Sequence, residues 1–109
     1  MLDQVGEVIM QSAAVATGDG TAFDTGTHGY NTLAMQVKGI TTATITFETT
    51  IDGTNWVAVL ATNVTSGTAA TTATADGVYR LDMSGLHQVR ARISAWTSGA
   101  ITVTGRGQA

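Results

Sequence analysis

Few side chains in this sequence are of types that carry out chemistry, and their spacing matches no familiar catalytic or metal-binding pattern. The chain has no cysteine, and its two histidines, His28 and His87, fall on widely separated segments. Thiolate ligands are therefore absent, and Asp24 with His28 does not complete the ligand set that zinc requires. The Gly18-Asp19-Gly20 segment lacks the alternating oxygen ligands of a calcium-binding loop. We expect no cofactor and no bound metal.

The acidic residues do not predict a catalytic carboxylate pair. Asp52 and Asp76 each precede a glycine, which is where turns use aspartate. Glu48 and Asp82 fall at outward-facing positions of expected strands. The chain also lacks a Gly-x-Ser-x-Gly elbow, a P-loop and a dinucleotide fingerprint. We therefore expect a protein that is not an enzyme.

Arginine and tryptophan side chains are the clearest candidates for a contact surface. Arg90, Arg92 and Trp96 share one face of an alternating segment, and Arg80 lies on the outward face of another. If the two segments are neighbours, the arginines form a small positive patch suited to an acidic partner surface. The alternative is that they pair across strands with carboxylates such as Glu48.

The two tryptophans are expected in different environments. Trp56 begins an apolar run, which predicts a place in the core, whereas Trp96 falls on the arginine side of its segment and is expected at the surface. An exposed tryptophan is also typical of sandwiches that stack on sugars. A carbohydrate-binding module is therefore an alternative function.

Composition restricts the class of protein. The chain has 109 residues, 43% of them hydrophobic and 12% charged, with a net charge of −3. This length fits one domain. Five lysines and arginines cannot form the basic stripe of a nucleic-acid-binding protein, and no apolar run is long enough to span a membrane as a helix. We expect no nucleic-acid partner, no membrane partner and no signal peptide.

Period-two alternation dominates the chain after residue 32. The 21 threonines and 13 glycines are typical of strands joined by tight turns. Alternating runs occupy residues 33–38, 44–51, 78–83, 89–96 and 100–105. Turn signals stand at Asp52-Gly53, Asp76-Gly77, Ser84-Gly85 and Ser98-Gly99. The pattern predicts an all-β, single antiparallel β-sandwich, jelly-roll-like or immunoglobulin-like, with essentially no helix.

The inward faces of these runs define the expected core. It comprises Leu33, Met35, Val37, Ile45, Phe47, Ile51, Tyr79, Leu81, Val89, Ala91, Ile93, Ile101 and Val103.

The N-terminal region is less regular than the rest. Residues 1–32 are expected to form a strand or arm of the same domain, whose sandwich body occupies residues 33–109. Val5, Val8 and Met10 lack the alternation seen later, and they are candidate contacts to a partner subunit. The alternative is an ordinary first strand followed by a surface loop.

Residues 33–106 resemble a group of small tailed-bacteriophage virion proteins. The resemblance is carried by Asp52-Gly53-Thr54-Asn55-Trp56 and by the ordered runs that follow at residues 76–86, 89–95 and 98–104. It implies a β-sandwich that coats or completes a virion, and it carries no catalytic residues.

We therefore expect a capsid decoration or cementing protein, with a tail or neck accessory protein as the alternative. Its expected partners are the major capsid protein or another virion protein. We also expect a homo-oligomer, with a trimer favoured, located in a virion that assembles in the host cytoplasm.

Overall fold

The computed structural model describes residues 5–24 and 30–108, and within these ranges the chain forms strands and no helix. The all-β prediction is confirmed. The strands are β1 (Val5–Ala14), β2 (Phe23–Asp24), β3 (Thr32–Thr50), β4 (Val57–Ala58), β5 (Ala61–Asn63), β6 (Ala69–Ala70), β7 (Thr72–Ala73), β8 (Gly77–Asp82) and β9 (Gln88–Gln108).

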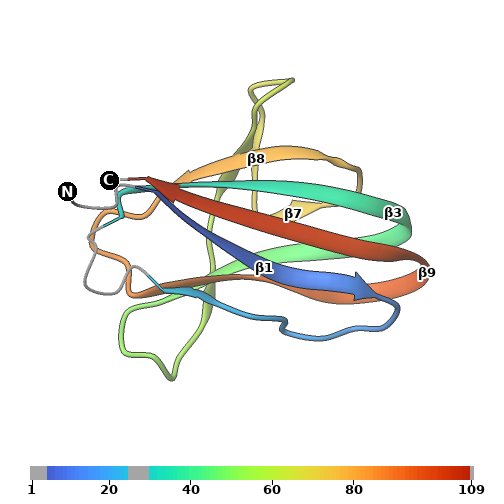
Figure 1. The fold of residues 1–109 in the computed structure, drawn as a ribbon, viewed down its shortest axis with the longest axis horizontal. Helices are drawn as coiled ribbons and strands as arrows, with labels where there is room; N and C mark the ends of the chain where they lie inside the picture. The colour runs from blue at the N-terminus through green and yellow to red at the C-terminus, as the bar shows by residue number, and fades with distance from the viewer. Residues whose placement is uncertain (1–4, 25–29, 109) are drawn as a thin grey trace.

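Two long strands form the frame of the molecule. β3 and β9 pair antiparallel along their whole length, from Thr32 opposite Gln108 to Thr50 opposite Gln88. Figure 1 shows this two-stranded ribbon folding back on itself, so that its two halves face each other as layers. The core lies between these halves.

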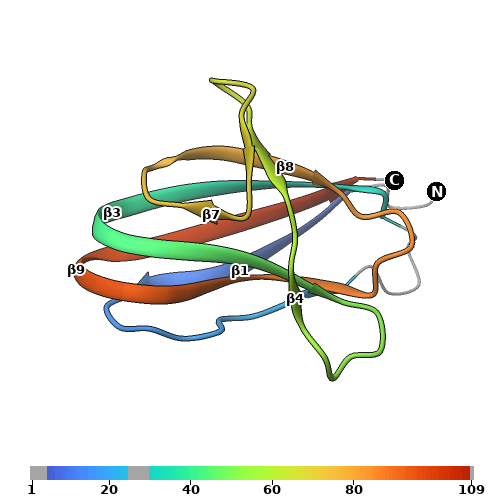
Figure 2. The same cartoon turned by 180° about the vertical axis from the view of Figure 1, so that it is seen from behind.

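Shorter strands extend each layer. In the first layer, β1 pairs with residues 101–108 of β9, and β8 pairs with residues 32–37 of β3 and carries β5 and β6 beyond it. In the second layer, β2 pairs with the start of β9, while β4 and β7 pair with the last part of β3. Figure 2 shows the chain crossing between the layers after β4.

The bend of the ribbon depends on two glycines and one carboxylate. Gly39 and Gly99 have φ values of 91° and 116°, and a side chain on Gly39 would collide with the carbonyl oxygen of Ala100. The Asp76 carboxylate accepts hydrogen bonds from the amides of Gly39 and Ile40 at 3.1 and 2.8 Å. The hairpin expected at Ser98-Gly99 is therefore wrong. The chain bends there but continues as β9.

The remaining turn signals are confirmed. Asp52-Gly53 lies in the loop that joins the paired strands β3 and β4, Gly77 opens β8, and a turn at residues 84–85 brings the Leu86 amide to the Met83 carbonyl at 3.0 Å. The uncharged stretch from residue 63 to 75 contains the two short strands β6 and β7.

The expected core is buried, with one exception. Phe47 in the second layer packs on Tyr79 in the first, with ring centroids 5.4 Å apart. The prediction that Ile51 belongs to the core is wrong, because this residue is 72% exposed. The alternation of buried and exposed residues stops at Thr49 and Thr50, which are both buried. β3 ends at Thr50, and Ile51 lies in the loop that follows.

The N-terminal region contributes large core side chains. Met10 and Phe23 are each 1% exposed, and Phe23 contacts Tyr30 edge to face at 5.6 Å. Space for them comes from Gly105 and Gly107, where a Cβ atom would overlap the Met10 sulfur and the Phe23 ring. Residues 5–24 therefore pack on the body as strand and loop. Residues 1–4 and 25–29, which the arm prediction also covered, lie outside the described residues.

Candidate functional site

Two of the candidate arginines converge on one carboxylate. Arg90 and Arg92 project from β9 on the outer face of the second layer, and Glu48 on β3 lies directly opposite Arg90. Both arginines donate from Nε to the same oxygen, Glu48 Oε1, at 2.8 and 3.1 Å. Cross-strand pairing with Glu48, the alternative to a free positive patch, is therefore confirmed.

Arg90 also joins two other segments to this cluster. Its guanidinium carbon lies 4.1 Å from the centroid of the Trp56 ring, and its Nη1 is 3.4 Å from Asp19 Oδ2. One face of Trp56 is thus covered by a cation rather than by the apolar interior. The prediction that Trp56 lies in the core is wrong, because β4 begins only at Val57 and Trp56 still belongs to the loop.

Trp96 is partly buried at the bend of the ribbon. Its indole Nε1 donates to the carbonyl of Gly99 at 2.9 Å, and the ring packs against the core cluster. Trp96 therefore stabilises the bend through a hydrogen bond within β9.

Arg80 does not join the other two arginines. It projects from β8 on the outer face of the first layer, whereas Arg90 and Arg92 lie on the outer face of the second. The condition for a patch of all three arginines, that their strands are neighbours, is therefore not met. Arg80 instead has a counterpart that the sequence analysis did not single out: Ala34 on β3 lies opposite Arg80 on one side and opposite Arg106 on the other.

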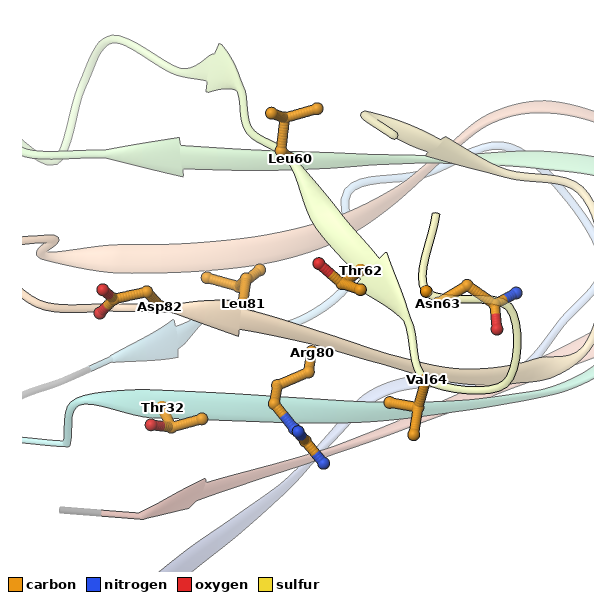
Figure 3. A pocket seen from close by; sticks show the side chains of 9 residues that line it. Thr32, Leu60, Thr62, Asn63, Val64, Arg80, Leu81 and Asp82 are labelled. Carbon is orange, nitrogen blue, oxygen red and sulfur yellow. The ribbon is translucent and has the colours of Figure 1, made fainter. Parts of the chain in front are cut away.

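The Arg80–Arg106 surface is hollowed on both sides of Arg80. One hollow of about 430 Å³ is lined by Thr32, Ala34, Arg80, Arg106 and Gln108. A second hollow of about 540 Å³ adjoins it under β5 and is shown in Figure 3, where Arg80 extends from β8 across β3. This surface and the Glu48 cluster are the two main arrangements of charged side chains in the described structure.

A third feature is the loop between β3 and β4. The Asp52 carboxylate accepts hydrogen bonds from the amides of Asn55 and Thr54, both at 2.8 Å, and from the side chains of Asn55 and Thr50. These donors, the Asn55 amide first, hold the pKa of Asp52 far below its ordinary value. The ordered loop presents Ile51 and Val57, which are 72% and 61% exposed.

The N-terminal candidates differ from one another. Val5 belongs to β1, where its backbone is opposite Gln108, and Val8 is partly buried against the core. Met10 is wholly inside the molecule, so it offers no surface to a partner and its assignment as a contact residue is wrong. Its neighbour Ile9 is 54% exposed on the outer side of the same strand.

Among residues 5–24 and 30–108, no group of three or more histidine, cysteine or acidic side chains is placed to hold a metal ion. His28 lies outside these ranges. No helix in the same part of the chain is long and apolar enough to cross a membrane.

A model of the XepA family matches residues 4–107. The chain belongs to the XepA family. The crystal structure of the SPBc2 prophage-derived protein YomS is similar, with 20% identity and a TM-score of 0.88 over 96% of this chain and 93% of that one. The PBSX exported protein XepA has 16% identity and a TM-score of 0.91 over 97% of this chain. No curated protein matches the sequence.

These structures show the same fold, and the match to XepA spans 38% of that longer chain. YomS is described as prophage-derived, which agrees at a coarse level with the expected link to phage proteins.

Proposed function

We propose that this chain is a structural component of a phage particle and that it decorates and stabilises the capsid. The observation that carries the proposal is the match to prophage-derived YomS, which extends over 93% of that protein. The likeness extends over nearly the whole fold of that prophage-derived protein. The proposal assigns it no enzymatic reaction.

The shape of the molecule supports this role. The outer surface of each layer is made of paired strands, and the ribbon is fixed at its bend by Asp76 and at the second layer by Glu48. Rigid surfaces lose little conformational freedom on docking. Modest contacts repeated by the symmetry of a shell add up to strong attachment. We also propose that the protein acts as a homo-oligomer, which light scattering of the purified protein would show.

The test uses particles from the phage or prophage that encodes the gene, with and without a deletion of it. We expect peptides of this protein in gradient-purified wild-type particles, and we expect deletion particles to release DNA at a lower temperature. Antibody labelling in the electron microscope should mark the head. Labelling of the tail or neck would overturn capsid decoration in favour of an accessory role.

The exported relative XepA defines the opposite outcome. If the protein is free in the culture fluid and absent from purified particles, the virion proposal is wrong. A hydrolytic turnover by the purified protein would equally overturn it.

A further inference from the structure

Arg80 and Arg106 lie on either side of Ala34, whose methyl group is the only side chain between them in register. Adjacent strands lie about 4.8 Å apart, so the backbones of β8 and β9 are separated by roughly 10 Å with only Ala34 between them. Arg80 and Arg106 both line the hollow of about 430 Å³, together with Thr32 and Gln108. Two guanidinium groups on opposite walls can bind one oxyanion from both sides, since each presents a planar fork of donors.

The arginines of this surface are not held in ion pairs within the described structure, although two carboxylates lie near them. Arg90 and Arg92 on the other layer form ion pairs with Glu48 and Asp19, but no ion pair among residues 5–24 and 30–108 includes Arg80 or Arg106. Two acidic residues lie close to these arginines in the strand register. Glu7 lies opposite Arg106 on β1 without forming an ion pair, and Asp82 accepts a hydrogen bond from the Ser84 amide at 2.8 Å.

Exposed apolar side chains occur in the hollow that adjoins the arginine pair. The adjoining hollow of about 540 Å³ shares Thr32 and Arg80 with the first and is lined by Leu60 and Val64, which are 59% and 45% exposed. In Figure 3, Val64 lies at the end of β5 on the side toward which Arg80 extends. Exposed apolar side chains beside an anion site favour a ligand that carries both kinds of group.

We propose that this surface binds a protein segment in which an acidic residue stands next to an apolar one. The carboxylate lies between Arg80 and Arg106, and the apolar side chain packs against Val64. A polyanion such as nucleic acid or an anionic membrane fits less well, because the chain as a whole carries a net charge of −3. The inference rests on the proposed function, for which it names the docking surface.

The first experiment is an NMR titration of the full chain with a capped Ala-Leu-Asp-Leu-Ala peptide and its Asn counterpart. We expect the Asp peptide to bind at least about fivefold more tightly, with shifts concentrated at residues 34, 80 and 106. R80Q and R106Q should each weaken it by about tenfold. R92Q removes the same charge from the opposite face, so it should leave binding within about twofold.

Equal binding of the two peptides, or no binding of either, overturns the inference. Tighter binding of inorganic phosphate or of phosphatidylglycerol vesicles than of the Asp peptide also overturns it. Both exposed arginines should tolerate glutamine, and a circular dichroism spectrum unchanged from wild type verifies folding.

The second experiment measures rebinding of the protein to particles that lack it. Loss of rebinding in R80Q and R106Q, but not in R92Q, supports the inference. Equal rebinding of all three variants overturns it and leaves the proposed function standing. Failure of the wild-type protein to rebind contradicts the proposed function, while the peptide titration still decides the docking surface.

Discussion

The guanidinium carbon of Arg90 lies 4.1 Å from the centroid of the Trp56 ring, which fixes the β3–β4 loop to the outer face of the second layer. Arg90 reaches Glu48 on the neighbouring strand and Asp19 on the segment after β1 from the same position. One side chain of β9 therefore contacts β3, the loop that follows β3, and the segment after β1. The geometry makes Arg90 a structural residue.

The stacking of Arg90 on Trp56 should contribute measurably to stability. We expect W56L to lower the free energy of unfolding by about 1 kcal/mol more than W56F, which keeps an aromatic face. A double-mutant cycle with R90Q, measured by urea denaturation, should give a coupling of about 0.5–1 kcal/mol for W56L. A coupling of zero would show that the contact is incidental.

Glu48 should matter more than the other acid that Arg90 touches. Its side chain is 12% exposed and accepts from two arginines, whereas Asp19 is 61% exposed. We expect E48Q to lower the free energy of unfolding by about 1–3 kcal/mol, because it removes the negative charge that two partly buried arginines share. D19N, the matched control, should change it by less than about 0.5 kcal/mol. Similar effects of the two variants would contradict this account.

Gly39 should be the least replaceable residue of the bend. Its φ is 91°, and a Cβ atom there would overlap backbone, whereas Gly85 with φ 80° has open space around it. We expect G85A to cost about 1 kcal/mol from backbone strain alone. G39A should cost about 2–3 kcal/mol more, since the two strands must move apart. Thermal denaturation followed by circular dichroism measures both, and equal costs would show that the bend is not closely packed.

Phe47 and Ile51 test the register of β3. Phe47 is fully buried against Tyr79, whereas Ile51 is 72% exposed. We expect F47A to lower the free energy of unfolding by about 3–5 kcal/mol and I51A to change it by less than about 0.5 kcal/mol. Urea denaturation of the two variants measures both changes in the free energy of unfolding. A large effect of I51A on the isolated protein would place that side chain in the interior.

Asp52 should make the β3–β4 loop sensitive to acid. Its pKa in the folded protein lies below the unfolded value, so its stabilising effect is fully present above about pH 4 and is lost as the pH falls toward the lowered pKa. Carboxyl carbon NMR should show Asp52 still ionised where ordinary aspartates have titrated. In N55A the Asp52 pKa should rise, because one side-chain donor is gone. Titration of Asp52 at an ordinary aspartate pKa would contradict the hydrogen-bond network.

Several features followed directly from local sequence patterns. Alternation placed residues such as Leu33, Phe47 and Ile93 inside, because successive side chains of a strand point to opposite faces. The Asp52-Gly53 pair predicted its turn correctly, since Gly53 adopts a φ of 82° that other residues avoid. These are properties of a few neighbouring residues.

Other features depended on partners that a local pattern does not contain. Ser98-Gly99 predicts a hairpin as readily as a bend, because a positive φ serves both, and only the opposing Gly39 of β3 decides for the bend. The end of β3 before Ile51 likewise depends on the pairing of neighbouring strands. Met10 lay in an irregular run, and its burial depends on the absence of a side chain at Gly105 on the adjacent strand.

The sequence by itself determined the strand content, most of the inward-facing residues and the positions of the tight turns, because these depend on short-range backbone preferences and on burial of alternate side chains. The tertiary structure alone decided which arginines meet. The folded ribbon puts β8 in the same layer as the second half of β9, so Arg80 faces Arg106. The first half of β9 lies in the other layer, where Arg90 and Arg92 share Glu48. Strand order is set by the packing of the whole chain, so the charge pattern of each surface emerges only when the layers close.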